Sequence, residues 1–222
     1  MKIVKDLVFF ITGGASGLGE ATVREIHALG ANVAIADFNE ERLALLQSEL
    51  KERILTIKCD VTSEEDVKAA VAKTVERFGT IHAALACAGI ATVSLTLSSR
   101  GSLDTELFKR TTEINVYGSV YVAKYCAVVM SKNKPLNDKG EKGVIMFVSS
   151  VAAEEGQRGQ VAYSSTKGAI NGLVLPMARD LGRYGIRVLS IAPGIFETPL
   201  SHAMPENVKK RLNADTALNR AG

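Results

Sequence analysis

The sequence has no tryptophan, only 5% aromatic residues, and three cysteines and three histidines among its 222 residues. The rest of the composition, with 46% hydrophobic and 23% charged residues, is that of an ordinary globular domain. A chain of this length can bury a full hydrophobic core, so we predict one domain spanning residues 1-222.

Neither the cysteines nor the histidines have the spacing of a metal site. The residues concerned are Cys59, Cys87, Cys126, His27, His82 and His202. An odd number of cysteines without such spacing is typical of free thiols in a reducing compartment. We therefore expect no bound metal.

Charge and hydropathy exclude two further classes of protein. The net charge is +3 and the basic residues are scattered, which does not support a nucleic-acid-binding role. No apolar run approaches the ~20 residues that span a bilayer, so we expect no membrane span. The first residues, MKIVKDLVFFITGG, lead directly into a predicted strand and leave no room for a removable signal peptide.

Short apolar runs alternate with helical patterns along the chain. We predict strands at 7–12, 32–36, 54–58, 81–87, 143–149 and 186–191. Helical patterns lie between them, near 17–29, 40–50, 63–78, 104–132 and 161–184. Continuous apolar strands separated by helices indicate a parallel sheet covered on both faces. We therefore predict an α/β fold with a Rossmann-like, doubly wound parallel sheet.

Two features interrupt this alternation. Residues 131–143, SKNKPLNDKGEKG, are polar and rich in turn formers, so they predict a surface loop before the fifth strand. Pro176 falls inside the last long helical pattern, where we expect it to kink the helix or mark an irregular middle.

The first predicted strand is followed by TGGASGLG, which opens a helix. Gly13, Gly17 and Gly19 allow the tight turn, the close backbone approach and the helix–strand packing that a pyrophosphate at a helix N-terminus requires. Ser16 and Leu18 complete the predicted contacts of this loop. A glycine pattern alone is weak evidence, but here a strand precedes it and a helix follows.

Asp37 ends the second predicted strand, about twenty residues after the glycine loop. A carboxylate there accepts hydrogen bonds from the adenosine ribose and repels a 2′-phosphate. No arginine or lysine lies within the loop or directly after Asp37. The sequence therefore predicts NAD rather than NADP.

Four more residues follow the ends of predicted strands. Asp60 and Val61 end the third strand, where adenine is expected, and Cys87 and Gly89 follow the fourth. Asp60 is equally suited to cap the next helix. For Cys87 a buried structural thiol is favoured over a reactive one.

The stretch AYSSTKGA places Tyr163 four residues before Lys167, on one face of a predicted helix. A cation at roughly 4 Å in an effective dielectric of ~20 favours the phenolate by up to ~4 kcal/mol. Such a pair in isolation is usually a packed tyrosine and a solvated lysine. Its meaning depends on the residues around it.

Those residues form a recognisable set. Ser149 and Ser150 end the fifth strand, and Ser150 lies thirteen residues before the tyrosine. Asn115 lies in EINVYGS of an earlier helix. With the glycine loop and the YxxxK pair, this set resembles the short-chain dehydrogenase/reductase family over nearly the whole chain.

The resemblance implies a role for each residue. Tyr163 would be the general acid/base, Lys167 would lower its pKa and hold the nicotinamide ribose, and Ser150 would bind the substrate oxygen. Asn115 would hold a water that relays the proton outward. Hydride transfer needs these roles, because the hydroxyl proton needs an acceptor and the forming carbonyl needs a donor.

The loop after the sixth strand contributes further candidates. Phe196 and Thr198 match nicotinamide-side positions of the family, and His202 follows them in the region that usually sets substrate specificity. Gln157 lies seven residues after Ser150, and substrate contact and solvent exposure are equally open for it.

Within the family, the segments DVTSEEDV, CAGIA and SVAAEEGQRGQVAYSSTKG resemble the subgroup that acts on 3-hydroxyacyl-CoA and hydroxysteroids. This implies an acyl-CoA or steroid substrate and a mitochondrial location, with the cytoplasm as the alternative. Reduction of 3-oxoacyl groups on acyl-carrier protein is a second enzyme hypothesis, disfavoured because that role usually takes NADPH. A scaffold subunit of a larger assembly is a third.

The chain departs from the family in two places. Many members read Asn-Asn-Ala-Gly where this chain has Ala86-Cys87-Ala88-Gly89, which we interpret as a mark of the subgroup. The chain also stops at NRAG, without the last strand of the family. We therefore expect a sheet that lacks this strand.

Two helical segments, 114–130 and 169–178, are apolar at nearly every position. One apolar face suffices to cover a sheet, so apolar surface remains on the other face. This predicts a homo-oligomer in which both helices pack against their copies, a dimer and, by resemblance, a tetramer. The alternative is that the 131–143 loop covers the surplus.

Overall fold

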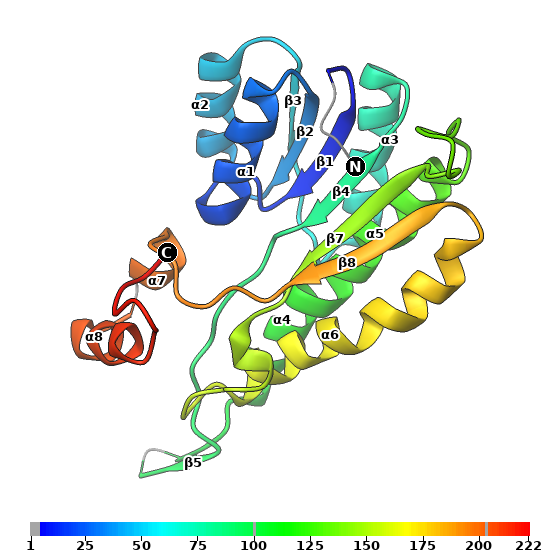
Figure 1. Cartoon of the computed structure of the whole chain (residues 1–222). Helices are drawn as coiled ribbons and strands as arrows, with labels where there is room; N and C mark the ends of the chain where they lie inside the picture. Colours follow the sequence, from blue (N-terminus) through cyan, green and yellow to red (C-terminus); the bar gives the residue numbers. More distant parts are fainter. Residues whose placement is uncertain (1–4, 100, 203) are drawn as a thin grey trace.

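The computed structural model describes residues 5–99, 101–202 and 204–222, and a parallel six-stranded sheet forms its centre (Figure 1). Its strands are β1 (Val8–Thr12), β2 (Asn32–Asp37), β3 (Ile54–Lys58), β4 (Ala83–Ala86), β7 (Gly143–Val148) and β8 (Ile186–Ile191). They lie in the order β3-β2-β1-β4-β7-β8, and every neighbouring pair is parallel. This is the order of a doubly wound nucleotide-binding sheet, which confirms the predicted fold class.

Helices cover both faces of the sheet. They are α1 (Gly17–Ala28), α2 (Glu40–Leu50), α3 (Glu64–Phe78), α4 (Thr105–Thr112), α5 (Gly118–Met130) and α6 (Val161–Gly182). Side chains of α1 and α2 form one buried cluster with the sheet, and those of α3, α5 and α6 form the other. Successive side chains of a strand point to opposite faces of the sheet. Phe10 packs in the α3–α5–α6 cluster and Ile11 in the α1–α2 cluster, and both are fully buried. The strands are continuously apolar for this reason.

The helix starts follow from short polar side chains. Asn39 accepts a hydrogen bond from a backbone N–H in the first turn of α2, and Ser63 does the same for α3. Helix α3 ends at Gly79, whose φ of 84° lies in the left-handed region that glycine tolerates.

The predicted helix over 104–132 is in fact three segments. Between α4 and α5 lies a π-helical turn, η1 (Glu113–Tyr117), which contains Asn115. Such turns are rare and frequently mark functional sites. Pro176 lies within α6 and does not divide it into two helices.

Several short elements have no counterpart among the predictions. They are the hairpin β5 (Leu97–Ser98) and β6 (Gly101–Ser102), the 3-10 turn η2 (Val151–Ala153), α7 (Pro199–His202) and α8 (Glu206–Ala214). The hairpin extends away from the sheet at the bottom of Figure 1, and α7 and α8 lie beyond the carboxyl end of β8. Residues 131–143 form the predicted loop, in which the backbone N–H of Leu136 donates to Glu141.

Strand β8 forms one edge of the sheet, and no described residue adds a seventh strand beside it. Leu189 and Ile191 of β8 are 41% and 44% exposed. Across the described ranges, no helix combines the length and the apolar character needed to cross a membrane.

Candidate active site

A cavity of about 710 Å³ lies at the carboxyl ends of the strands. Strands β1 and β4 are neighbours, but β1 leads into a helix of one face and β4 leads into helices of the other. In a doubly wound sheet this divergence opens the ligand crevice. Most predicted site residues line this cavity: Gly13, Ser16, Gly17, Leu18, Cys87, Gly89, Ser150, Gln157, Tyr163, Lys167, Phe196 and Thr198.

The glycine loop has the conformation that the sequence predicts. Gly13 and Gly17 have φ values of +65° and +53°, and a Cβ on Gly13 would lie 2.6 Å from Cα of Ala88. A Cβ on Gly19 would lie 2.1 Å from the carbonyl oxygen of Gly13, so Gly19 serves packing and does not line the cavity. Ser16 precedes the first turn of α1 and makes no capping bond with its side chain. The N–H groups of that turn are therefore available to an anion.

Asp37 holds a fixed orientation at the end of β2. Its Oδ2 accepts a hydrogen bond from the backbone N–H of Ala15 at 2.9 Å, and its Oδ1 accepts from that of Asn39 at 3.0 Å. A carboxylate has about four lone-pair sites, so each oxygen retains capacity for a hydroxyl donor. Asp37 does not line the cavity itself; it bonds to the glycine loop at Ala15.

Asp60 and Val61 do not line the cavity either. Oδ1 of Asp60 accepts from the backbone N–H and the hydroxyl of Thr62, at 2.9 and 2.8 Å. The cap of α3 is Ser63, so Asp60 does not have the alternative capping role. Val61 is 8% exposed and packs against Gly118.

Tyr163 and Ser150 both line the cavity and interact with each other. Tyr163 lies in the first turn of α6, and Ser150 precedes η2, where its Oγ accepts from the backbone N–H of Ala152 at 3.1 Å. Burial raises the pKa of the Tyr163 phenol, and a hydrogen bond with Ser150 acts in the opposite direction. The expected lowering of this pKa by Lys167 is therefore wrong for the structure as it stands. Burial dominates here, and Ser150 provides the opposing effect.

Lys167 is buried, with 7% of its surface exposed. Its Nζ donates to the carbonyl oxygen of Val148 at 2.7 Å and lies 5.6 Å from the centre of the Tyr163 ring. Burial lowers the pKa of Lys167 to about 8. A lysine that pointed to solvent would not show this shift in pKa. The alternative in which Tyr163 packs and Lys167 is solvated therefore does not apply.

Asn115 is 1% exposed and its side chain is almost fully bonded. Its amide hydrogens go to the carbonyl oxygen of Ile90 and the hydroxyl of Thr166, both at 3.0 Å, and its Oδ1 accepts from the N–H of Ile90 at 2.9 Å. A Cβ on Gly89 would lie 3.2 Å from this Oδ1 and 3.7 Å from Nζ of Lys167. Asn115 therefore holds the loop after β4 close to the lysine.

Cys87 lies at the end of β4 beside this group. Burial raises the pKa of its thiol to about 11, with the Lys167 ammonium acting in the opposite direction. The group is a thiol at neutral pH, which agrees with the structural reading of this residue.

The loop after β8 closes one side of the cavity. A Cβ on Gly17 would lie 3.5 Å from Cβ of Thr198, so this loop touches the glycine loop. Oε1 of Gln157 accepts from Nη2 of Arg211 in α8 at 3.2 Å. His202 lies 3.4 Å from Glu197 and is not part of the cavity lining.

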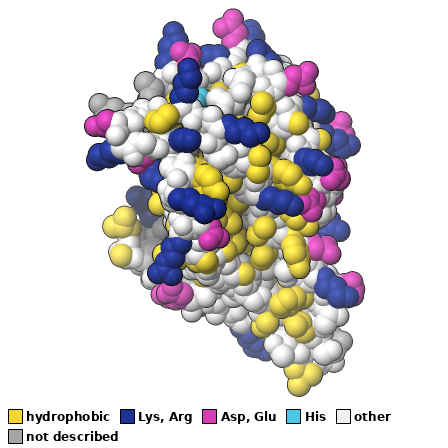
Figure 2. All heavy atoms as spheres, turned by 90° about the vertical axis from the view of Figure 1, so that its right-hand side faces the viewer, with side chains coloured by type: hydrophobic (Ala, Val, Ile, Leu, Met, Phe, Trp, Pro, Cys, Tyr) yellow, Lys and Arg dark blue, Asp and Glu magenta, His cyan; other side chains and the backbone are white. Residues whose placement is uncertain are grey.

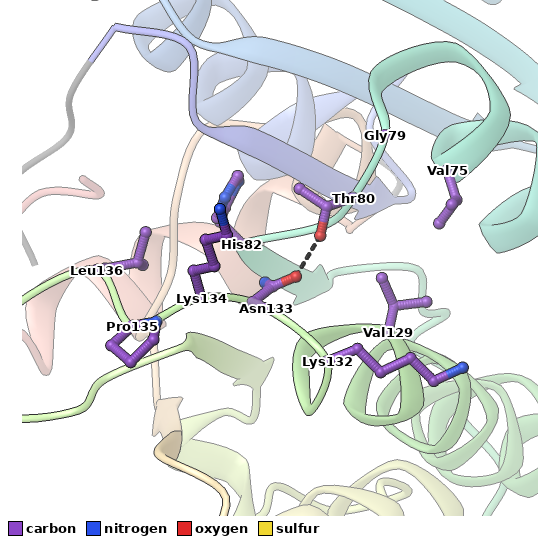
Figure 3. A pocket seen from close by; sticks show the side chains of 10 residues that line it. All are labelled: Val75, Gly79, Thr80, His82, Val129, Lys132, Asn133, Lys134, Pro135 and Leu136. Carbon is purple, nitrogen blue, oxygen red and sulfur yellow. Dashed lines mark hydrogen bonds between the residues drawn. The ribbon is translucent and has the colours of Figure 1, made fainter.

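A second hollow, of about 470 Å³, lies at the opposite end of β4 (Figure 3). The hydroxyl of Thr80 donates to Asn133 there, and Nδ1 of His82 accepts from the backbone N–H of Val8 at 3.0 Å. None of the predicted site residues lines it. Among the described residues no histidine, cysteine or carboxylate belongs to a group of three or more that could hold a metal ion.

Sequence reasoning missed the ion pair of Arg42 and Glu20, which contacts the glycine loop at Ala15. Arg42 of α2 donates from Nε to the carbonyl oxygen of Ala15 at 3.1 Å and forms an ion pair with Glu20 of α1. Their separation of 22 positions gives no local signal, because only folding brings them together.

Comparison with known proteins agrees with this geometry. The model of the family described as "short chain dehydrogenase" matches residues 7–209. The chain is 44% identical over 209 residues to "3-hydroxyacyl-CoA dehydrogenase type-2" of Homo sapiens, covering 93% of this chain and 80% of that protein.

Two solved structures are similar as well. The 3-hydroxyacyl-CoA dehydrogenase type-2 of Mycobacterium avium superimposes with a TM-score of 0.90 at 34% identity, covering 100% of this chain and 86% of that one. A 3-ketoacyl-(acyl-carrier-protein) reductase from Brucella melitensis, complexed with NADH, gives a TM-score of 0.88 at 26% identity, covering 98% and 86%.

Proposed function

The chain belongs to the short-chain dehydrogenase family, and on this basis we propose that it is an NAD-dependent oxidoreductase that interconverts a secondary alcohol and a ketone. The observation that carries the proposal is the convergence of Ser150, Tyr163 and buried Lys167 beside an uncapped helix start. A helix start suits the pyrophosphate, and the three side chains suit proton transfer next to it.

The residues present fit a dinucleotide. Gly13 and Gly19 let the loop pack closely on the protein backbone, where a Cβ would clash, and Asp37 keeps free lone pairs for the ribose hydroxyls. Lys167 would hold the nicotinamide ribose, and Phe196 and Thr198 line the same cavity. When bound, the dinucleotide would supply the hydride acceptor for the carbinol carbon.

The side chains then have distinct tasks. Ser150 donates to the substrate oxygen and holds it near Tyr163, whose phenolate takes the hydroxyl proton as the carbonyl forms. Lys167, with a pKa of about 8, is still protonated at neutral pH, and its ammonium would hold the nicotinamide ribose beside Tyr163.

The proton leaves towards Lys167 and Asn115, which converge on Gly89. Both side-chain amide hydrogens of Asn115 already bond to Ile90 and Thr166. A water that relays the proton would therefore bond to Oδ1 or to the backbone carbonyl oxygen of Asn115.

For the substrate we propose a 3-hydroxyacyl-CoA, oxidised to the 3-oxoacyl-CoA. Relatives with this name match most of the chain at 41% and 44% identity, in Drosophila melanogaster and Homo sapiens. Hydroxysteroids are a further candidate class from the subgroup resemblance. Acyl-carrier-protein substrates stay a second candidate, because a similar solved structure carries that activity in its name together with NADH.

The test is NAD reduction, followed by nicotinamide absorbance, on a panel of 3-hydroxyacyl-CoAs, hydroxysteroids and short alcohols. The reverse reaction is run with a 3-oxoacyl-carrier protein. We expect the highest kcat/KM with a 3-hydroxyacyl-CoA. The substrate assignment is wrong if the carrier protein or a steroid is preferred, and the reaction class is wrong if nothing on the panel reacts.

We also propose that the chain forms a homodimer through α5 and α6, extended to a tetramer. Figure 2 shows hydrophobic side chains gathered between charged ones on the side that lies to the right in Figure 1, where α6 lies. Tyr117, Val128 and Leu175, on or next to these helices, are 52%, 54% and 56% exposed. A symmetric contact would remove them from water. Light scattering at micromolar concentration tests this, and a clean monomer contradicts it.

For the compartment we propose the mitochondrion, on the subgroup resemblance alone. Fractionation of cells that express the chain with a C-terminal tag tests it, and recovery in the cytoplasmic fraction supports the alternative.

A further inference from the structure

Arg42 and Asp37 share one neighbour, Ala15 of the glycine loop. The N–H of Ala15 donates to Oδ2 of Asp37 at 2.9 Å, and its carbonyl oxygen accepts from Nε of Arg42 at 3.1 Å. Ala15 is 1% exposed and is thus held at both of its backbone polar groups. Ala15 therefore links the carboxylate of Asp37, proposed to bind the ribose, to the guanidinium of Arg42. No sequence motif predicts that Arg42 lies at the glycine loop.

Glu20 holds this guanidinium in place. Its side chain is 15% exposed and lies in the first turn of α1, with Oε2 bound to Nη2 of Arg42. Oε1 of Glu20 is 2.8 Å from Arg24, which is also paired with Glu49 at 2.6 Å. The carboxylate of Glu20 is mostly buried, although Arg24 and Arg42 are 41% and 43% exposed, so these ion pairs are less screened by solvent than a fully exposed pair.

This arrangement has a consequence for nucleotide choice. A 2′-phosphate would lie next to Asp37, and it binds arginine best through two parallel N–H donors. Arg42 and Asp37 bond to the same residue, Ala15, but Nε of Arg42 donates to the carbonyl oxygen of Ala15 and Nη2 donates to Glu20. The pair of donors that Arg42 could offer side-on to a phosphate, Nε and Nη2, therefore already has protein partners.

We propose that Glu20 is a specificity-determining residue for the dinucleotide. It keeps Arg42 on the glycine loop, where the arginine positions Ala15 and Asp37 for a ribose with free hydroxyls, and it withholds the guanidinium from a 2′-phosphate. This rests on the proposed use of a nicotinamide dinucleotide. The role of Glu20 differs from charge repulsion between Asp37 and the 2′-phosphate. Removal of Glu20 should raise NADP affinity even when residue 37 carries no charge.

The experiment measures dissociation constants of NAD and NADP by calorimetry, without substrate. The Asp37→Asn variant sets the baseline, and Glu20→Gln is added to it. We expect the double variant to bind NADP at least ten-fold more tightly than Asp37→Asn alone. Adding Arg42→Gln should remove the gain, because the gain requires the released guanidinium.

The matched control is Glu49→Gln in the Asp37→Asn background. It removes the same charge from the same ion-pair network but leaves the bond between Glu20 and Arg42 intact. We expect no gain in NADP affinity. An equal gain in this control, or a gain that survives Arg42→Gln, overturns the proposal, because simple charge removal then explains it.

Two further readouts keep the outcomes distinct. Glu20→Asp shortens the side chain by one methylene and should change NADP affinity in the same direction if Glu20→Gln does not fold. NAD binding by the unmodified protein tests the proposed function separately. If neither dinucleotide binds, the proposed function fails; if NAD binds and the double variant gains nothing, only the role of Glu20 fails.

Discussion

Replacement of Lys167 by methionine should stabilise the protein while it abolishes turnover. Burial lowers the pKa of this lysine from 10.5 to about 8, so the folded state disfavours its charged form. A shift of this size corresponds to about 3 kcal/mol at neutral pH. Methionine has a similar length and needs no hydration, so it removes this penalty.

The substitution also has a cost. Nζ of Lys167 now donates to the carbonyl oxygen of Val148, and loss of this partner should destabilise the fold by about 1 kcal/mol. We therefore expect a net gain of about 1–2 kcal/mol without dinucleotide. For a chain of this size that is a rise in Tm of a few degrees, at roughly 2–4 °C per kcal/mol.

The stabilisation by Lys167→Met should decrease as pH rises. Because the folded pKa lies below the unfolded one, the unfolded chain binds more protons between about pH 8 and ~10.4, and unmodified protein becomes more stable as pH rises through that interval. The advantage of Lys167→Met should be full at pH 7 and should shrink by more than half at ~9.5.

Calorimetric unfolding at both pH values measures this difference. The matched control is Lys73→Met on the exposed face of α3, which should change Tm little at either pH. A Lys167→Met variant that is less stable than the unmodified protein, with no change in the difference between pH 7 and 9.5, would refute the reasoning.

Three further substitutions test other parts of the site. Asp37→Ala should narrow the affinity gap between NAD and NADP, measured by titration, and an unchanged gap would contradict the ribose contact. Gly19→Ala should lower Tm and weaken dinucleotide binding, because its Cβ would meet the carbonyl oxygen of Gly13 at 2.1 Å; unchanged values would show that the loop adapts. Asn115→Ala should destabilise the protein by about 1–3 kcal/mol in urea unfolding, because it leaves the backbone N–H and carbonyl of Ile90 unpaired. A change below ~0.5 kcal/mol would show that Asn115 does not hold the loop after β4.

Much of this fold follows from periodicity alone. Every end of the six strands of the main sheet lies within two residues of the predicted run, and the largest difference is at the start of β4. A strand buried on both faces must be apolar throughout, and that signal is strong. The short elements after β8 carry no such signal, because α8 has no buried residue.

The site was predictable where its chemistry is local in sequence. The glycine loop and the pair of Tyr163 and Lys167 depend on spacings within one helix or turn. The balance of effects on the tyrosine was not predictable, since desolvation depends on what surrounds it in three dimensions. The same holds for Asn115, whose π-helical turn and bonds to the β4 loop join residues 25 positions apart.

The most direct test of the central claim compares Tyr163→Phe with the unmodified protein. Calorimetry gives NAD affinity, and single-turnover absorbance gives the rate of hydride transfer from a 3-hydroxyacyl-CoA. We predict NAD affinity within about two-fold and a rate at least ~1,000-fold lower, because only the proton-transfer group is lost. A variant that keeps more than a few per cent of the rate would contradict the role of Tyr163 and the mechanism built on it.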